Sequence, residues 1–477
     1  LSDNSGIVWL GTNNGLLKID KYKYQFDKYA SNGISKYITH DYVRSIYTDK
    51  QGNLWIGMRN GAVNKLCYNR LNNQYRFSGS YLLHYCNKNL SEYTVNCFLQ
   101  LRNGKLLVGG QQGVSCLKIN SNIFTKYLPD SISTRIDEVW CLYEDANGNI
   151  WIGCNNLGLF IYNPMSKRVY HYIHSSDKNT ITGNSIWNIY ESKNGYIWLG
   201  TSNGLCFTQQ PCKVQNLSFK QCILKDTKPI QVWSIVEDRD SNLWIGTTGN
   251  GLYSVSLNTS KINHFNNLVN NVVASVFFDK KGTIWVSTVN GLYHYDKQIN
   301  LIDRFGEQDG LQSSDFNFKA YSIAANDKVF LGTKSGIVSF SPDSIKVRNY
   351  NSVPVYITSL KISGVDSSRA ISQHNSINLS YKQNTINIGF TIVDFSKPET
   401  HTYRYKLEGF QKKWTYTSAD QPYANYTNIP PGKYKFLLEG SVNGNDWNAQ
   451  SQFLFIDIHP ALWQRPIFWF ALGIATV

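Results

Sequence analysis

The sequence has few of the features of a helical protein. Only two Met occur among 477 residues, and apolar residues scarcely recur at the spacing of an amphipathic helix. Aromatic residues instead make up 14% of the chain, which also has 35 Gly. Because aromatic side chains suit a pleated sheet and Gly suits turns, this composition predicts an all-β protein. The length exceeds that of one compact core, so two or more domains are expected.

Clustered positive charge is also lacking. The formal net charge is +14, yet no run of five or more Lys or Arg occurs. Neither a basic helix nor an RNA-binding signature is present, which argues against nucleic-acid binding by this segment. Scattered charge is typical of a solvated basic surface. It also attracts anionic ligands such as acidic glycans, because a summed positive field raises their local concentration.

The cysteines show no metal-binding pattern. There are nine, which cannot all pair, and none has a CxxC or other zinc-like spacing. We therefore expect inert thiols, with a disulfide between Cys212 and Cys222 as the alternative, and no metal or other cofactor. The chain begins at Leu1 and has no signal peptide. We interpret it as an internal piece of a longer protein.

One hairpin motif occurs eight times, as in "NGNIWIGCNNLGLF" at residues 147–160. An aromatic or apolar anchor recurs in it every 41 to 52 residues. Such a period matches one four-stranded blade of a β-propeller. The anchors are Trp9, Trp55, Leu107, Trp151, Trp198, Trp244, Trp285 and Phe330.

The motif has a fixed pattern, Asp-x-x-Gly-x-x-Trp, as in Asp145, Gly148 and Trp151. The Asp accepts hydrogen bonds from turn amides, and Gly permits the positive φ of a tight turn. We expect the Trp to point between blades, where its large apolar area joins neighbouring sheets.

Seven of the eight units are complete. The first lacks its inner strand, because Trp9 lies too near the start of the chain. We therefore predict a remnant of a preceding blade and a linker at 1–34, and one seven-bladed propeller at 35–347. The strand "YQFDKYA" near Tyr24 is a candidate to close the ring by adding to the last blade, since an open ring exposes sheet edges. A single eight-bladed ring is the alternative.

A column of varied residues marks the candidate ligand surface. Eleven residues before each anchor from Trp55 onwards lies a position in the expected innermost strand. The residue type at this position differs from blade to blade, although the flanking residue is apolar. A position near the mouth of the central channel behaves in this way. Arg, Asn, Lys and Trp grip sugar hydroxyls or stack on sugar faces. The column comprises Arg44, Asn96, Trp140, Trp187, Trp233, Ala274 and Lys319.

All column members except Ala274 are proposed as ligand contacts. Arg135 and Glu138, in a loop that enters one inner strand beside Asp137, are added to them. The alternative is that the three Trp only pack between blades.

The repeat ends before residue 348, and a second domain is expected at 348–460. Alternating segments such as "HTYRYKLEGF" and "GKYKFLLEGSV" are separated there by turn signals such as "PPGK". About 100 residues with this spacing favour a β-sandwich of the immunoglobulin or fibronectin type.

Two sequence features together resemble a known family. The stretch "YRYKLEGFQKKW", followed by "ANYTNIPPGKYKFLLEGSVNGNDW", is similar to the Y_Y_Y domain, with Tyr403, Tyr405, Tyr426 and Tyr434 as its Tyr positions. The hairpin units resemble the two-component-regulator propeller repeat, although Leu107 departs from the pattern. In this order, with "DGLQSSDFN" between them, they resemble the periplasmic sensor region of hybrid two-component systems of Bacteroidetes.

The resemblance carries several expectations. It implies two seven-bladed propellers before the Y_Y_Y domain, so that Trp9 belongs to the end of the first. It implies a periplasmic region of an inner-membrane protein, a homodimer formed through the Y_Y_Y region, and a histidine kinase, a receiver and a DNA-binding module outside this chain.

The C-terminus predicts the start of a transmembrane helix at 461–477. The segment "PIFWFALGIATV" is apolar throughout but has only 12 residues, whereas a spanning helix needs about 20. Trp463 and Trp469 suit the membrane interface, and Arg465 suits the headgroups. The alternative is a short apolar tail that covers the sandwich.

The favoured function is a ligand sensor that is not itself an enzyme. It binds an oligosaccharide, for which the positive charge favours an anionic one, and relays the signal through the Y_Y_Y domain. One alternative is a secreted carbohydrate-active enzyme, a glycosidase or lyase, because the turns are similar to the Asp-box of sialidases. However, a glycosidase needs two carboxylates about 5 to 10 Å apart across a sugar, and Asp137 and Glu138 are neighbours that diverge on a strand. The other alternative is a protein-binding scaffold.

Overall fold

A computed structural model provides the structure of the protein. It describes residues 1–3, 6–31, 38–72, 74–83, 93–117, 123–133, 135–209, 214–224, 230–265, 271–296, 301–346, 353–362, 365–369, 376–442, 447, 451–464 and 468. The chain divides into two compact units. One comprises Tyr22–Lys346, and the other comprises Leu1–Lys21 together with Val347–Val477.

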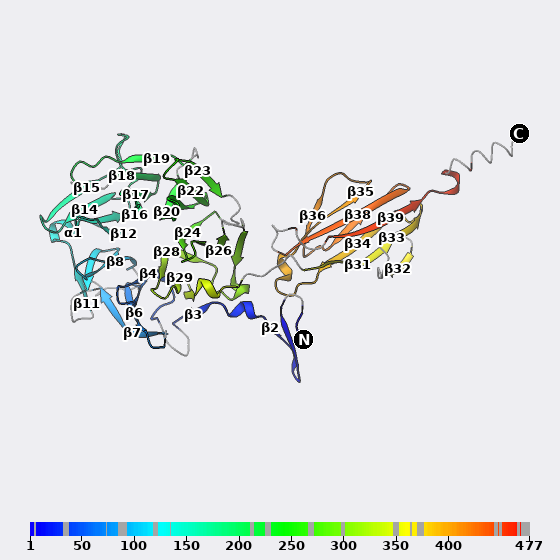
Figure 1. Ribbon diagram of the computed structural model, residues 1–477, viewed down its shortest axis with the longest axis horizontal. Coiled ribbons are helices and arrows are strands. Elements are labelled where there is room, and N and C mark those ends of the chain that lie inside the picture. Colours follow the sequence, from blue (N-terminus) through cyan, green and yellow to red (C-terminus); the bar gives the residue numbers. More distant parts are fainter. Residues whose placement is uncertain are drawn as a thin grey trace. The chain divides into compact units, whose positions relative to one another are not determined.

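The unit from Tyr22 to Lys346 is a seven-bladed β-propeller, as the sequence predicts. Its four-stranded blades surround a central axis in Figure 1. The first two blades contain β4 (Val43–Thr48), β5 (Leu54–Met58), β6 (Ala62–Asn69), β7 (Gln74–Leu83), β8 (Val95–Gln100), β9 (Leu106–Gly110), β10 (Gly113–Leu117) and β11 (Ile123–Lys126). The next three contain β12 (Val139–Glu144), β13 (Ile150–Cys154), β14 (Leu159–Asn163), β15 (Arg168–Tyr172), β16 (Ile186–Glu191), β17 (Tyr196–Thr201), β18 (Gly204–Gln209), β19 (Lys220–Cys222), β20 (Gln231–Glu237), β21 (Asn242–Thr248), β22 (Leu252–Ser256) and β23 (Ile262–Phe265). The last two contain β24 (Val273–Phe278), β25 (Ile284–Thr288), β26 (Gly291–Asp296), β27 (Leu301–Phe305), β28 (Phe316–Ile323), β29 (Val329–Thr333), β30 (Gly336–Phe340) and β3 (Asp27–Tyr29).

An N-terminal strand closes the ring. β3 pairs antiparallel with β30 and becomes the outer strand of the last blade. This is the closure suggested by "YQFDKYA". Phe26, just before β3, packs its ring against Phe305 and Phe340 at centroid distances of 5.7 and 5.5 Å. The first and last parts of the propeller sequence are therefore held together in one blade.

The first two blades are joined in a way that the repeat does not predict. Their outer strands β7 and β11 pair in parallel, so the two blades form one sheet of eight strands. The long β7, with ten residues, extends far enough to reach its neighbour.

The recurring Asp fastens the hairpins that contain it, as expected. In the blade of Trp151, both oxygens of the buried Asp145 accept hydrogen bonds, from the backbone N–H and side-chain amide of Asn149 and from Trp151 Nε1 at 3.0 Å. The same bond joins Asp49 to Trp55 at 2.9 Å. In the fourth blade Ser192 replaces Asp and its Oγ accepts from Trp198 Nε1 at 3.1 Å.

The anchors also pack between blades. Trp151 lies in an apolar cluster with Ile186 and Ile197 of the following blade. Leu107, which departs from the Trp pattern, packs on Val139 and Ile152 of its own following blade. Each blade thus buries one face against the next, which is where the apolar core of the propeller lies.

Side chains near the start of the inner strands tie neighbouring blades together. Ser45 Oγ donates to Val95 O at 2.7 Å, and Asn188 Nδ2 donates to Trp233 O at 3.1 Å. The corresponding bonds elsewhere run from Asn96 to Val139 O, Cys141 to Ile186 O, Val276 N to Ser234, and Asn317 to Val43 O. The last of these joins the seventh blade to the first and so closes the inner ring.

The second unit contains a β-sandwich, as predicted. One sheet has the order β32 (Val365–Arg369), β31 (Val355–Ile362), β34 (Ile386–Ile392), β37 (Tyr423–Tyr426). The other has the order β33 (Ser376–Ser380), β39 (Gln452–His459), β38 (Gly432–Ser441), β35 (Thr402–Glu408), β36 (Thr415–Ser418). Tyr403, Tyr426 and Tyr434 lie in the core between the sheets, and the partly buried Tyr405 packs against it.

The same unit includes the N-terminal hairpin of β1 (Val8–Thr12) and β2 (Gly15–Ile19). Trp9 Nε1 donates to Asp3 Oδ2 at 2.8 Å, as in a complete blade. Trp9 also meets the ring of Phe395 edge to face at 5.6 Å. This incomplete repeat therefore packs on the sandwich.

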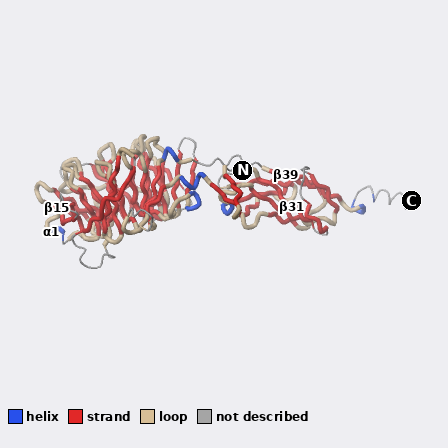
Figure 2. Tube along the Cα trace, turned by 90° about the horizontal axis from the view of Figure 1, so that it is seen from below, coloured by secondary structure: helices blue, strands red, loops and turns tan. Residues whose placement is uncertain are grey.

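Strands make up nearly all of the regular structure in both units (Figure 2). The helical elements of the described ranges are single turns, namely α1 (Asp130–Ser133), η1 (Lys21–Tyr24), η3 (Glu307–Asp309), η4 (Pro342–Ser344), η5 (Pro398–Thr400) and η6 (Leu462–Gln464). In the described part of the chain, no helix has the length and apolar character needed to cross a membrane. Most of the predicted transmembrane start, at 465–467 and 469–477, lies outside the described residues.

Replacing Asp145 by Ala is expected to destabilise the propeller by about 2–4 kcal/mol, because several buried donors lose their acceptor at once. Asp145→Ser should cost less, because Ser192 serves as the acceptor in the fourth blade. The midpoint of urea unfolding, followed by tryptophan fluorescence, measures both. Wild-type stability of Asp145→Ala would show that this bond does not fasten the hairpin.

Candidate ligand-binding site

The varied column coincides with a recurrent irregularity of the inner strands. In each of the first six blades the pairing of the inner strand skips one residue, as between Val139 and Cys141, where Trp140 is left unpaired. The skipped residues are Arg44, Asn96, Trp140, Trp187, Trp233 and Ala274. A β-bulge re-aims the side chain it carries. The seventh blade has a longer irregularity between Phe316 and Tyr321, and Lys319 lies within it at a φ of 56°.

Aromatic side chains from several blades meet inside the ring. Trp187 and Trp233 stack at a centroid distance of 4.1 Å and an angle of 6°. Phe318 stacks on Trp233 at 4.3 Å, and Trp140 meets Trp233 edge to face at 5.2 Å. Because these residues belong to the third, fourth, fifth and seventh blades, their rings form an aromatic plug across the channel.

The plug contradicts the expectation that sugar rings can stack on all three Trp side chains. Trp187 and Trp233 are only 7% and 8% exposed. Their faces are covered by each other and by Phe318, so they offer no open ring face to a sugar. Trp140 is half-buried and is the most accessible of the three.

Arg44 lies directly beside the plug. Its guanidinium carbon is 4.4 Å from the centre of the Trp140 ring, and its Nε donates to Asn96 Oδ1 at 3.3 Å. Burial lowers the pKa of Arg44, although the nearby Tyr42 and Glu138 partly offset this effect. A cation at this position is therefore poorly compensated by the protein itself.

Two other column residues donate hydrogen bonds to main-chain oxygens. Asn96 Nδ2 donates to Val139 O at 3.1 Å, and Lys319 Nζ donates to Trp187 O at 2.9 Å. The Lys319 bond reaches from the seventh blade to the fourth. Both residues therefore hold the inner ring together, whatever else they contact.

The two loop candidates differ in burial and in contacts among the described residues. Glu138 is half-buried and its Oε2 accepts from Asn155 Nδ2 at 2.7 Å. Arg135 is exposed, and the structure gives its side chain no contact with the column. The structure thus brings six predicted residues together with Glu138 nearby, and it leaves Arg135 outside the group.

Two indole N–H groups of the plug have no acceptor among the described residues. Both Trp140 Nε1 and Trp233 Nε1 are buried. A buried donor without a partner costs free energy, so such a group normally has a protein, water or ligand acceptor. Sequence reasoning missed Phe318, which lies next to Lys319; its place in the plug depends on contacts across the ring.

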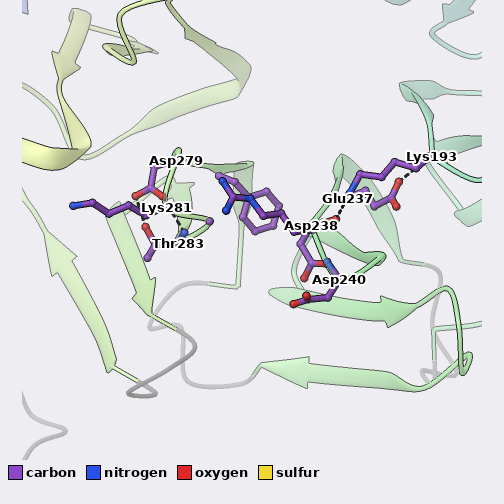
Figure 3. A pocket seen from close by; sticks show the side chains of 10 residues that line it. Lys193, Glu237, Asp238, Asp240, Asp279, Lys281 and Thr283 are labelled. Atoms are coloured by element: carbon purple, nitrogen blue, oxygen red, sulfur yellow. Dashed lines mark hydrogen bonds between the residues drawn. The ribbon is translucent and has the colours of Figure 1, made fainter.

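A separate pocket lies where the inner strands end, opposite the bulges. Its volume is about 760 Å³, and Figure 3 shows the side chains around it. The lining residues are Lys193, Glu237, Asp238, Arg239, Asp240, Phe278, Asp279, Lys281, Gly282 and Thr283. The sequence contains one signal for it, a basic residue after the turn position in five units, namely Lys50, Arg102, Lys193, Arg239 and Lys280.

Most charges of this pocket are used within the protein. Asp238 accepts from Trp244 Nε1 at 2.9 Å, and Lys193 Nζ donates to Asp238 O at 2.7 Å. Arg239 donates to Lys280 O of the next blade. These residues fasten neighbouring turns, so the pocket is a weaker candidate for ligand recognition than the column.

Two family models match the chain. The two-component regulator propeller model matches residues 37–60, 135–156, 180–203, 228–249 and 267–290, and the Y_Y_Y domain model matches residues 394–459. The chain carries regulator propeller repeats and a Y_Y_Y domain.

The chain is similar to extracellular domains of hybrid two-component systems and to a histidine kinase. The extracellular domain of a hybrid two-component system from B. thetaiotaomicron is 25% identical, with a TM-score of 0.75, and the match covers 96% of this chain and 61% of that one. A second such domain from the same organism is 19% identical with a TM-score of 0.54, which shows the fold alone. Histidine kinase P4 of Formosa agariphila is 32% identical over 203 residues, which are 41% of this chain and 15% of the kinase. The chain thus spans less than two thirds of the length of these relatives.

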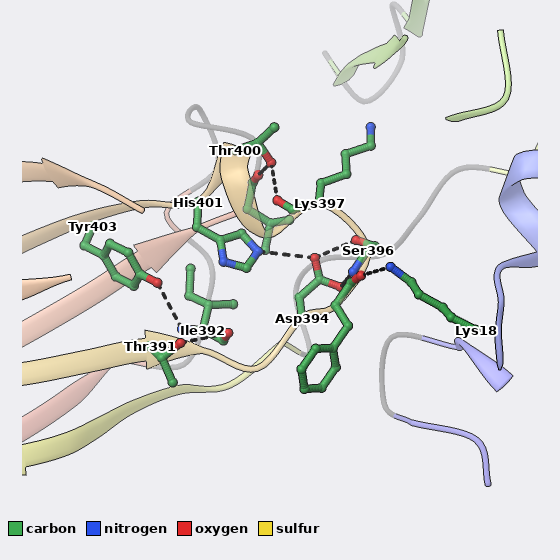
Figure 4. A network of polar contacts seen from close by, with 11 residues as sticks. Lys18, Thr391, Ile392, Asp394, Ser396, Lys397, Thr400, His401 and Tyr403 are labelled. Carbon is green, nitrogen blue, oxygen red and sulfur yellow. Dashed lines mark hydrogen bonds and ion pairs between the residues drawn. The ribbon is translucent and has the colours of Figure 1, made fainter. Parts of the chain in front are cut away.

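The Y_Y_Y domain contains a buried polar network (Figure 4). Asp394 and His401 are almost fully buried, and His401 Nε2 lies 3.4 Å from Asp394 Oδ2. Ser396 donates to both Asp394 oxygens, at 3.1 Å from its N–H and 2.6 Å from its Oγ. Between them, Phe395 O accepts from Lys18 Nζ of the N-terminal hairpin. The network therefore fixes the loop on which the hairpin rests.

Burial keeps the thiols of Cys141 and Cys206 in the regulator propeller protonated. Burial raises the pKa of Cys141 to about 11 and that of Cys206 to about 11. A thiol is nucleophilic only as a thiolate. Among the described residues, no group of His, Cys, Asp and Glu has the arrangement of a metal site.

The Asp394 network predicts acid sensitivity of the Y_Y_Y domain. Burial raises the pKa of this carboxyl, but hydrogen bonds from His401 and Ser396 outweigh burial and lower it to about 2. The resulting stability is present above the unfolded pKa of about 3.9 and is lost as the pH falls towards 2.

Asp394→Asn should remove this pH dependence. Unfolding midpoints between pH 5 and 2 would fall less steeply in the variant than in the wild type, whereas the exposed Asp420→Asn should follow the wild type. Equal slopes for wild type and Asp394→Asn would contradict a charged Asp394 in the folded domain.

Proposed function

We propose that this chain is the extracytoplasmic ligand-sensing region of a membrane-bound hybrid two-component sensor. The regulator propeller binds a glycan fragment, and the Y_Y_Y domain relays the signal to a cytoplasmic histidine kinase outside this chain. The observation that carries the proposal is the joint match of both modules to the extracellular domain of a hybrid two-component system.

The propeller offers the recognition surface. At the bulges the scaffold is constant while the side chains vary, and Arg44 lies over the Trp140 ring with Glu138 near enough to influence its charge. Polar groups that converge beside an aromatic surface are typical of ligand sites. Arg135, Asn96 and Lys319 complete the proposed contact set, together with the edges of Trp187 and Trp233.

Sensing requires two states that differ in affinity for the ligand. A glycan that binds both states equally shifts nothing, however tightly it binds. We propose that binding favours one arrangement of the receptor, that the Y_Y_Y region forms a homodimer, and that a helix beginning near residue 461 carries the signal into the inner membrane. The basis for the dimer is the family resemblance, and the basis for the helix is the apolar C-terminal sequence.

A thermal-shift screen of oligosaccharides tests the proposal. A glycan that binds only the folded protein must raise the melting temperature. It increases the free energy of unfolding by roughly RT ln(1 + [L]/Kd). We expect a shift with intact recovery of the glycan by chromatography. Release of cleaved or eliminated products would favour the carbohydrate-active enzyme, and stabilisation by protein partners alone would favour the scaffold.

A further inference from the structure

The donors beside the plug lack acceptors. Arg44 has five N–H donors, of which only Nε has a hydrogen-bond partner, Asn96, within the described part of the chain. The guanidinium rests on Trp140, whose Nε1 is buried and has no partner among the residues that the structure describes. Trp140 in turn contacts Trp233, which is 8% exposed and whose Nε1 is likewise unpartnered. Three contiguous side chains thus present hydrogen-bond donors and no acceptor.

The charge around Arg44 is unbalanced as well. Among the described residues, no carboxylate forms an ion pair with it. Glu138 is close enough to influence Arg44, but one of its oxygens is bound to Asn155, and Arg59 adds a second positive charge nearby. A buried cation without a paired anion is costly for a protein to maintain.

We propose that Arg44, Trp140 and Trp233 form an anion cradle that binds a carboxylate or sulfate group of an acidic glycan. An oxyanion supplies the acceptors that both indole N–H groups and the Arg44 Nη atoms lack. The planar guanidinium suits bidentate contact with such a group. This inference rests on the proposed glycan-sensing function and specifies the chemistry of its ligand.

The cradle explains why an Arg stands in this column. Asn96 and Lys319 are bonded to main-chain oxygens of other blades, so their role in holding the ring is visible. Arg44 makes no such bond to a neighbouring main chain in the described residues. A bound anionic ligand would supply the counter-charge and offset the free-energy cost of holding this guanidinium without an ion pair.

The variants separate binding from structure. Arg44→Met keeps the apolar stem and removes the donors, while Arg44→Lys keeps the charge without the planar fork. Trp140→Phe and Trp233→Phe keep an aromatic ring and remove the N–H. Arg168→Met, at an exposed position of β15, is the matched control. Without ligand, Arg44→Met should melt no lower than the wild type, because it relieves a partly buried unpaired charge. A purely structural Arg44 predicts a lower melting temperature.

The first probe is trigalacturonate, compared with its carboxyl-reduced form, and the second is a chondroitin sulfate disaccharide, compared with its desulfated form. Inorganic sulfate is compared with chloride at equal ionic strength. Calorimetry and tryptophan fluorescence report binding. We expect the acidic member of a pair to bind more tightly, with a loss on the order of 30-fold or more in Arg44→Met. Smaller losses are expected in Arg44→Lys and both Trp→Phe variants, and none in Arg168→Met. The two acidic probes distinguish carboxylate from sulfate recognition.

Three results would overturn the cradle. Equal affinity for acidic and neutral partners in wild type and Arg44→Met would remove the cradle but leave glycan sensing intact. Absence of binding by every glycan, acidic or neutral, would remove the proposed function and the cradle together. A response to inorganic sulfate that is identical in wild type and Arg44→Met would show that no anion is held at Arg44.

Discussion

Every blade of the propeller has apolar faces that only another blade can cover. Trp151 and Leu107 each rest on the strands of the following blade, so the array has no stable end until it returns to its start. Closure is therefore the constraint on which the rest of the structure depends. It is met in two layers, by β3 pairing with β30 at the rim and by Asn317 bonding Val43 O at the centre. The pairing with β3 also covers the edge of β30, which would otherwise be exposed.

A closed ring leaves one position per blade free to vary. The bulge residue of each inner strand is excluded from the pairing, so its identity does not affect the ladder. In this protein that freedom is divided between two tasks. Trp187 and Trp233 fill the axis with a stacked plug, whereas Arg44 and Trp140, beside it, have donors without a partner in the described part of the chain. The proposed recognition site thus lies next to the aromatic plug.

The fold could be predicted from the sequence because its causes are local. The Asp-x-x-Gly-x-x-Trp pattern predicts a hairpin, and its period predicts a propeller blade. The Tyr positions of the second domain, such as Tyr403 and Tyr426, indicate the core of a sandwich. The parallel pairing of β7 with β11 was not predictable, since the outer strands lie outside the repeated pattern. The column was found, but its geometry was not. Whether Trp233 faces a ligand or Phe318 depends on contacts between blades far apart in sequence.

The most direct test of the account is a crystal structure of the protein with a bound acidic oligosaccharide. The account predicts a carboxylate or sulfate oxygen within hydrogen-bonding distance of the Arg44 guanidinium and of Trp140 Nε1, at the bulge end of the channel. A ligand seated instead in the pocket beside Lys193 and Glu237, with Arg44 and Trp140 untouched, would contradict it.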